Sequence, residues 1–218
     1  MYFFEVQKKF FTKACLLFLS FILLSVFVAQ YDTLALDIFL TDVLQQNIPR
    51  IFDLFFSMFS LLGSAEITTF ILIILAIQWL VKKNYLALLG LTLFPVISLI
   101  ELAGKFFIHH SGPPVALYRG ILHFNLPSQF IQTGYSYPSG HVTRTTFLIV
   151  IFLAFVYFGK YRRKKIVLFI LALFLFIMLF SRIYLGEHWA SDVLGGLLLG
   201  SSFGMLASIF TTPCLDRK

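Results

Sequence analysis

The sequence KIVLFILALFLFIMLFSRIYLGEHWASD, residues 165–192, joins an apolar run to a group of polar and charged side chains. A helix needs about 20 mostly apolar residues to cross roughly 30 Å of hydrocarbon, and the run approaches this length. Arg182, His188 and Asp192 follow at its end, at successive offsets of six and four. Such polar groups are costly in a hydrophobic protein unless they have a function. The stretch therefore predicts a membrane-spanning helix with a functional site at its end.

The composition extends this interpretation to the whole chain. Of the 218 residues, 59% are hydrophobic and 12% are charged, and the mean hydropathy is +0.91. Charged residues make up about a quarter of ordinary soluble domains, so that class is excluded. We predict a single membrane domain over residues 1–218. The net charge of +7 lies mostly in short clusters beside apolar runs, which indicates membrane topology rather than nucleic acid binding.

The two cysteines and the N-terminal region add little chemistry. Cys15 and Cys214 lie near opposite ends of the chain, so we expect neither a structural disulfide nor a metal site. Lysines followed by an apolar run near the N-terminus also fit a cleaved signal peptide. The run is long enough to remain as a first spanning helix, which is the interpretation we prefer.

Apolar runs predict an all-α fold with six membrane-spanning helices. They cover residues 14–30, 65–81, 86–104, 142–159, 165–181 and 191–211. Between residues 35 and 63 the apolar residues recur with helical spacing but are interrupted by polar residues. This pattern favours amphipathic helices that lie at the membrane interface. A short re-entrant pair is the alternative for this segment.

Basic clusters fix the orientation of the six spans. All of them fall on one side, which the positive-inside rule makes cytoplasmic: Lys8, Lys9 and Lys13; Lys82 and Lys83; Lys160, Arg162, Arg163, Lys164 and Lys165; Arg217 and Lys218. The loop after the first span instead carries several aspartates against a single arginine, as expected for the outer side. The polar groups at 105–119, 138–141 and 182–192 then share the outer side, and we expect them to meet in one layer.

The third of these groups has the residues for attack on phosphorus. Histidine suits this role, or proton transfer, because its unperturbed pKa is about 6.5. His188 and Asp192 share a helix face, so the aspartate can hold one ring nitrogen and leave the other free. Arg182 offers a planar fork for phosphate oxygens. Taken alone, the same residues also fit a buried ion pair between Arg182 and Asp192 with His188 as a capping residue.

The second group, Pro-Ser-Gly-His at residues 138–141, comes just before an apolar run. This order predicts a loop entering a helix, where backbone amides and the helix dipole favour an anion. Gly140 allows a close approach of the backbone, Ser139 can donate a hydrogen bond, and His141 is a second imidazole. A plain turn with a helix cap is the alternative.

Together these residues resemble the type 2 phosphatidic acid phosphatase superfamily, which includes membrane lipid phosphatases, glucose-6-phosphatase and vanadium-dependent haloperoxidases. Its motifs are a lysine followed after six residues by Arg-Pro, then Pro-Ser-Gly-His, then Ser-Arg, five residues, His, three residues and Asp. Residues 138–141 and 181–192 match the second and third motifs completely. The first motif keeps Lys105 and Pro113, but Gly112 stands in the position of its arginine.

The resemblance implies a six-helix membrane fold and a phosphatase that uses no metal or other cofactor. By this resemblance His188 is the nucleophile that forms a phosphohistidine, Asp192 orients it, and His141 protonates the leaving group. The groups expected to bind the phosphoryl oxygens are those of Lys105, Ser139, Gly140 and Arg182.

The arginine missing at Gly112 needs a replacement or leaves the site with one cation fewer. Arg119 follows on the same outer side, and we predict that its side chain returns to the same phosphate. Contact with lipid headgroups is the alternative role for Arg119. His109 and His110 are further candidates for the gap, and Arg144 is a candidate for substrate binding.

These features predict a lipid phosphate or diphosphate phosphatase of the cytoplasmic membrane whose site faces the periplasm or exterior. Its expected partners are the lipid phosphate substrate and membrane lipids, with no nucleic acid. Undecaprenyl diphosphate is the first candidate substrate, followed by phosphatidate and phosphatidylglycerol phosphate. A phosphotransferase that uses the same site and a catalytically weakened lipid-binding homologue are the alternatives. The sequence makes no prediction of oligomeric state.

Overall fold

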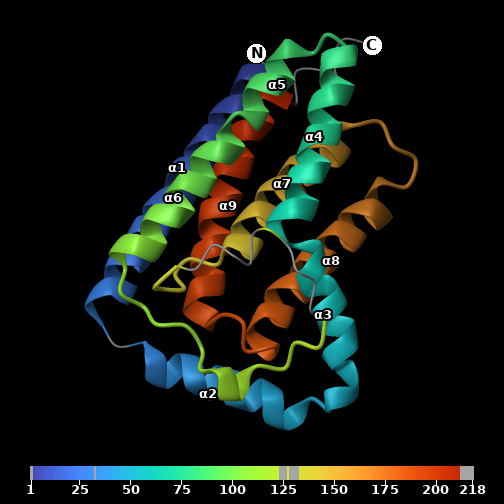
Figure 1. Cartoon of the computed structure of the whole chain (residues 1–218). Helices are drawn as coiled ribbons and strands as arrows, with labels where there is room; N and C mark the ends of the chain where they lie inside the picture. The colour runs from blue at the N-terminus through green and yellow to red at the C-terminus, as the bar shows by residue number, and fades with distance from the viewer. Residues whose placement is uncertain (1, 32, 123–126, 128–132, 212–218) are drawn as a thin grey trace.

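The protein is a bundle of helices, seen in a computed structural model that describes residues 2–31, 33–122, 127 and 133–211 (Figure 1). Within these residues there is no β-strand, which confirms the all-α prediction. The helices are α1 (Tyr2–Gln30), α2 (Leu34–Asn47), α3 (Asp53–Leu62), α4 (Ala65–Val81), α5 (Tyr85–Leu91), α6 (Leu93–Phe107), α7 (Gly140–Phe158), α8 (Lys164–Tyr184) and α9 (Ala190–Thr211), with short 3-10 turns η1 (Arg50–Phe52) and η2 (Val115–Leu117).

The long helices have the length and hydropathy of membrane spans. Within the described part of the chain, α1, the α5–α6 pair, α7, α8 and α9 meet both criteria. The α3–α4 pair meets them together but is bent by 46°. Counted as one span, it brings the number to the predicted six. The bend falls at Gly63 and Ser64, where the Ser64 hydroxyl caps α4 by accepting a hydrogen bond from the backbone N–H of Ile67 (3.3 Å).

Two spans differ in detail from the prediction. Helix α1 begins at Tyr2 rather than near residue 14, because no helix-breaking residue precedes the apolar run. The third predicted span is divided into α5 and α6 at Thr92. Pro95, in the first turn of α6, has no backbone N–H to donate to the carbonyl of Leu91, so the helix restarts there.

The segment between the first two spans forms two helices. Helix α2 crosses the lower end of the bundle in Figure 1, transverse to the long helices, whereas α3 leads into α4. Asp37 and Thr41 on α2 are buried, and α2 contacts both α8 and α9. The transverse α2 is therefore packed under the ends of the two helices that carry the third motif.

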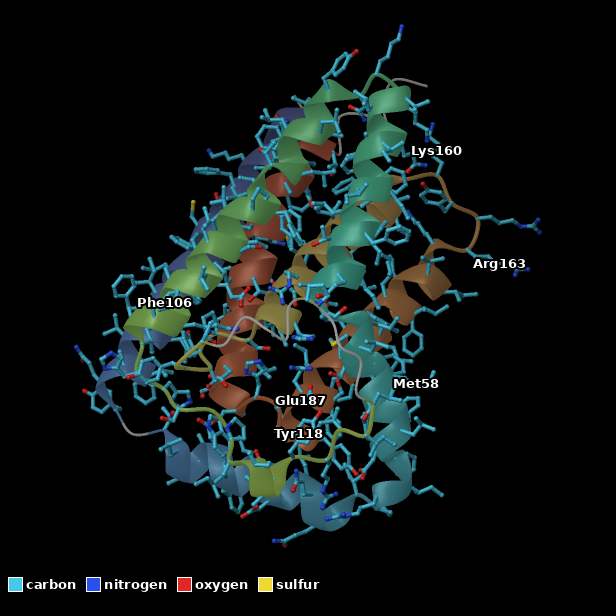
Figure 2. All side chains as sticks on the ribbon, in the orientation of Figure 1. Met58, Phe106, Tyr118, Lys160, Arg163 and Glu187 are labelled. Atoms are coloured by element: carbon cyan, nitrogen blue, oxygen red, sulfur yellow. The ribbon has the colours of Figure 1, made fainter. Side chains whose placement is uncertain are left out.

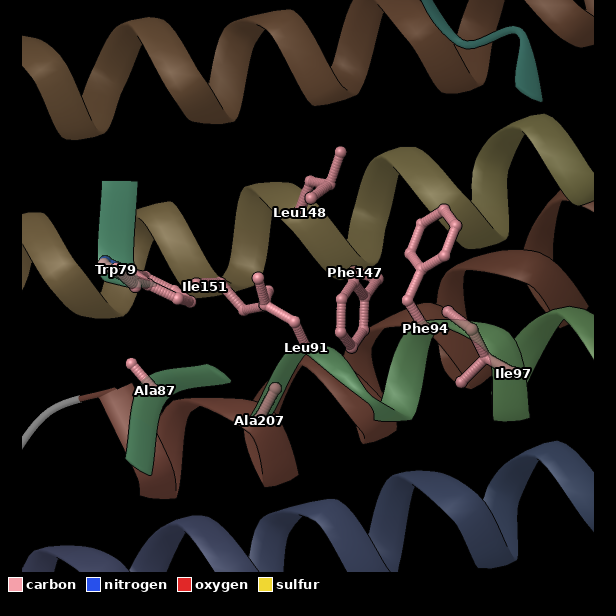
Figure 3. Packing of buried hydrophobic residues seen from close by; sticks show 9 residues of the cluster. All are labelled: Trp79, Ala87, Leu91, Phe94, Ile97, Phe147, Leu148, Ile151 and Ala207. Carbon is pink, nitrogen blue, oxygen red and sulfur yellow. The ribbon is translucent and has the colours of Figure 1, made fainter. Parts of the chain in front are cut away.

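An apolar core joins helices α4, α5, α6, α7 and α9. Figure 3 shows its buried members, which are Trp79, Ala87, Leu91, Phe94, Ile97, Phe147, Leu148, Ile151 and Ala207. On α8, by contrast, the apolar side chains of Phe169, Ile170 and Phe176 are exposed on the surface of the bundle. A helix whose apolar side chains point outward is expected where lipid takes the place of water.

Three glycines on α9 let it pack closely against α7. Gly196, Gly200 and Gly204 are spaced four residues apart, the small-residue pattern that brings membrane helices together. A Cβ atom at Gly196 would lie 2.6 Å from the Ser139 carbonyl oxygen, and one at Gly200 would lie 2.4 Å from the Thr143 carbonyl oxygen. Larger residues at these positions would push α9 away from α7. The glycines therefore set the distance between the second and third motifs.

Candidate active site

The third motif lies where α8 ends and α9 begins. Gly186 has a φ of +64°, which side chains rarely tolerate, and a Cβ atom there would meet the Leu117 carbonyl oxygen at 2.3 Å. After this turn, the backbone N–H groups of Glu187 and His188 both donate to the Arg182 carbonyl oxygen at 3.1 Å. The turn holds His188 beside the end of α8.

His188 and Asp192 form the predicted pair. The Nδ1 atom of His188 lies 3.2 Å from Oδ2 of Asp192, which leaves Nε2 as the other ring nitrogen. The same Oδ2 accepts the backbone N–H of Trp189 at 3.0 Å, as in a helix capping box. Arg182 forms its ion pair with Glu187 instead. The alternative of a buried pair between Arg182 and Asp192 is therefore wrong.

The surroundings of His188 favour its neutral form. Burial lowers the pKa of His188 from its ordinary value of 6.5, and the hydrogen bond to Asp192 opposes this effect without cancelling it. A neutral imidazole has a lone pair on one ring nitrogen, which is what attack on phosphorus requires. Burial therefore favours the form of His188 that could act as a nucleophile.

The second motif lies directly against the third. Helix α7 begins at Gly140, as predicted, and the backbone N–H of Ser139 donates to the Asp192 carbonyl oxygen at 3.0 Å. Ser139 is fully buried, and its hydroxyl has no hydrogen-bond partner within the described residues. Buried polar groups are nearly always hydrogen-bonded, so this hydroxyl is available to a ligand. His141 lies close enough to His188 to interact with it electrostatically.

Basic side chains surround His141, and carboxylates hold them. Arg182, Arg144 and Lys105 all interact electrostatically with His141. The Arg182 guanidinium bonds to Glu187 and to the Ser60 hydroxyl. The Lys105 ammonium lies 2.9 Å from the Glu101 carboxylate, one turn earlier on α6. The structure thus gathers Lys105, Ser139, Gly140, His141, Arg182, His188 and Asp192 into one region.

Arg119 is directed elsewhere. Its guanidinium donates to the carbonyl oxygens of Gln45 (2.8 Å) and Ile48 (3.3 Å) and to the Tyr184 hydroxyl (3.2 Å). It also lies over the Tyr184 ring, 5.3 Å from the centroid. These contacts do not support the prediction that Arg119 replaces the arginine missing at Gly112. They assign its guanidinium to anchoring the end of α2 against α8.

A second polar cluster lies behind Asp192. Asp37 on α2 accepts hydrogen bonds from the backbone and hydroxyl of Ser191, at 2.9 and 2.7 Å. The Nε2 atom of His110 lies 3.0 Å from the Ser191 hydroxyl and 3.7 Å from Oδ1 of Asp192. Burial raises the pKa of Asp37, but the hydrogen bonds from His110 and Ser191 lower it more, so its pKa lies below the usual value. Asp37 is thus a carboxylate that steadies the start of α9.

A pocket of about 490 Å³ with a mixed polar and apolar lining opens beside Arg182 and His141. Hydroxyl groups of α3 and its junction with α4 line one side, and the turn around Gly186 and Glu187 lines the other. Figure 2 shows Glu187 and Tyr118 inside the lower half of the bundle, whereas Lys160 and Arg163 lie on the loop toward the upper end. Because α7 begins at Gly140 and ends at Phe158, the catalytic candidates and the exposed basic loop lie at opposite ends of this helix.

Comparison with known families fits this geometry. The model of the PAP2 superfamily matches residues 84–214, which include all three polar motifs. The chain belongs to the PAP2 superfamily. No curated protein matches it by sequence. A PAP2 protein of known structure, described as the first transmembrane PAP2 type phosphatidylglycerolphosphate phosphatase from Bacillus subtilis, has a TM-score of 0.75 at 22% identity, over 94% of this chain and 99% of that one.

That likeness confirms the fold of this PAP2 protein, a multi-pass membrane bundle, and not its substrate. Within the described residues, no three histidine, cysteine or carboxylate side chains converge to hold a metal ion.

Sequence reasoning missed some of the residues around the PAP2 site. Glu187 and Ser60 both hold Arg182, a role that the sequence did not assign to either of them. Sequence reasoning also missed Asp37 as a partner of Ser191. The position of Asp37 within the apolar run LALDIFL, residues 34–40, was a usable signal, because a charged side chain among apolar residues needs a partner when it is buried. Nothing in the spacing indicated which partner.

Proposed function

We propose that this protein is a lipid phosphatase that works through a phosphohistidine on His188 at the outer face of the membrane. The observation that carries the proposal is the buried His188–Asp192 pair, 3.2 Å apart, next to His141 and the basic side chains around it. Positioning and charge stabilisation provide most of the catalysis in phosphoryl transfer. This arrangement supplies both.

Two steps complete the reaction. In the first, Nε2 of His188 attacks phosphorus, the bond to the leaving oxygen breaks, and protonated His141 gives its proton to that oxygen. In the second, water attacks the phosphohistidine, His141 takes a proton from the water, and the P–N bond breaks to release phosphate. Asp192 accepts the Nδ1 proton of His188 in a hydrogen bond and steadies its positive charge. Lys105, Arg182, Ser139 and the Gly140 amide stabilise the phosphoryl oxygens.

The outer location rests on the distribution of charge. The exposed lysines and arginines of the α4–α5 and α7–α8 loops lie at the end opposite the site, and the positive-inside rule assigns such loops to the cytoplasm. At the outer surface a lipid headgroup reaches the site while its tail remains in hydrocarbon. Undecaprenyl diphosphate is the first candidate substrate, because an outward site suits the recycling of carrier lipids. Phosphatidate and phosphatidylglycerol phosphate follow.

The test is phosphate release by purified protein from a panel of lipid phosphates and diphosphates. We expect release from at least one substrate, unchanged by a metal chelator, and background release by His188→Ala. Arg163→Ala, on the exposed α7–α8 loop, is the control and should release phosphate like the parent. Equal release by the parent and His188→Ala would end the proposal.

The same assay separates the two alternatives. Transfer of the phosphoryl group to an acceptor in place of free phosphate would identify a phosphotransferase, whose acceptor would occupy the pocket beside His141 and Arg182. Binding of lipid without any turnover would identify a lipid-binding homologue.

A further inference from the structure

The site lacks one of its expected cationic groups. Gly112 has no side chain to offer, and Arg119 is engaged with Gln45, Ile48 and Tyr184. Loss of one donor to a developing negative charge costs about 10²–10³ in rate in a comparable enzyme. A functional site therefore needs another guanidinium near the phosphoryl position.

Arg144 lies where such a group is needed. It follows His141 by three residues on α7, so the two side chains share a helix face. Its side chain is 13% exposed, and its Nη1 atom donates to Oε2 of Glu101 at 2.6 Å. It also interacts electrostatically with both His141 and Arg182. An arginine that is largely shielded at the start of a membrane helix is costly unless it has a function.

Glu101 holds Arg144 and Lys105 side by side at the start of α7. Its carboxylate binds Lys105 at 2.9 Å and Arg144 at 2.6 Å. A Cβ atom at Gly140 would lie only 2.2 Å from Oε1 of Glu101, so the carboxylate lies against the first residue of α7. The two cations are therefore held by a carboxylate that lies beside Gly140, whose amide is one of the groups assigned to phosphate binding.

Three buried donors around this point have no partner within the described residues. They are the Ser139 hydroxyl, Nε of Arg182 and Nε of Arg144. A buried donor left without an acceptor is costly, and a phosphoryl group brings several strong acceptor oxygens. Ser139 and Arg182 belong to the motifs that predict phosphate binding. Arg144 shares their unsatisfied state, although it lies outside those motifs.

We propose that Arg144 supplies the phosphoryl-binding guanidinium that Gly112 lacks, and that Glu101 is the positioning residue that holds Arg144 and Lys105. The proposal rests on the proposed function, because it assigns a role within the same phosphate site. It makes this chain a PAP2 protein in which the second phosphate-binding arginine, beside Arg182, comes from α7 in place of the loop after α6.

The experiment measures binding of inorganic phosphate to the full-length protein in detergent by calorimetry, together with turnover. Arg144→Gln should weaken phosphate binding about tenfold or more, because it removes a hydrogen bond between charged groups. Arg144→Lys should recover part of the loss, because a lysine keeps the charge but not the fork. Arg163→Gln, on the exposed α7–α8 loop, is the matched control and should bind phosphate like the parent.

Two double variants separate phosphate binding from a structural role. Gly112→Arg should restore phosphate binding to Arg144→Gln, because it returns a guanidinium to the vacant position; restoration also shows that the variant is folded. In a Glu101→Gln background, Arg144→Gln should still weaken binding. If Arg144 served only as the counter-ion of Glu101, Arg144→Gln would have no effect on phosphate binding in that background.

Parent-like phosphate binding by Arg144→Gln would overturn the proposal, as would loss of its effect in the Glu101→Gln background. Phosphate binding that depends on Arg144 in a protein without turnover would support this inference and contradict the phosphatase, so the two failures are distinguishable.

Discussion

The two ends of the bundle carry the same kinds of basic side chain in opposite settings. At one end, Lys82, Lys83, Arg162 and Arg163 are exposed on loops. At the other, Arg182 is 5% exposed and bonded to Glu187 and Ser60, while Lys105 and Arg144 share Glu101. Exposed charges need no partner and mark topology, whereas buried ones persist only when held by carboxylates. Burial and pairing therefore separate an anion site from a topology signal.

Replacing one arginine at each end by alanine should give the largest difference in activity. Arg182→Ala should lower kcat/KM about 10²–10³-fold, as removal of an oxyanion donor does. Arg163→Ala should leave it unchanged, since that side chain lies on an exposed loop. Steady-state phosphate release by both variants measures the difference. A comparable loss in the two variants would contradict the separation of roles.

Packing between α7 and α9 tests the framework of the site. At Gly200 a Cβ atom would lie 2.4 Å from the Thr143 carbonyl oxygen, whereas nothing lies within 4 Å at Gly134. Gly200→Val should therefore destabilise the protein by about 1–3 kcal/mol through overpacking. Gly134→Ala should be nearly neutral. Thermal unfolding in detergent checks both, and equal midpoints would show that close α7–α9 packing is unimportant.

The smallest expected effect is on pH dependence. His188 attacks only when neutral, so activity falls as the pH drops through its folded pKa. Burial lowers that pKa from 6.5, which moves the acid limb of kcat/KM below pH 6.5. Asp192 opposes the shift, so Asp192→Ala should move the limb to still lower pH. A profile of kcat/KM against pH decides, and an acid limb above pH 6.5 would contradict the burial of a neutral His188.

Much of the fold follows from the sequence, because the hydrocarbon core of a membrane restricts which segments can span it. Spans must be long and apolar, and basic loops choose a side, so the six spans were predictable. The break at Thr92 was also legible in principle, since Pro95 removes a backbone donor. The 46° bend between α3 and α4 was not predicted. Helix α3 packs against α8, which is distant in the sequence, and residue spacing carries no information on such contacts.

The site was predictable where spacing along one helix decides the contact. His188 and Asp192 are four residues apart, and so are Glu101 and Lys105; both pairs form. Contacts between distant segments were not predictable. Arg119 bonds to Gln45, some seventy positions away, and periodicity carries no information on such partners. The same limit hid the Glu101–Arg144 pair, in which the two residues come from different helices.

The most direct test of the account is to locate a covalent phosphoryl group on the protein. Full-length protein is mixed with a lipid substrate carrying a labelled terminal phosphate, quenched in alkali to preserve phosphohistidine, and mapped by mass spectrometry. We predict label on His188 of the parent protein and none in His188→Ala. With a substrate whose leaving group needs no proton, His141→Ala should carry more label than the parent, because the second step then lacks its base. Turnover without label on the parent protein, or label on any other residue, would contradict His188 as the nucleophile.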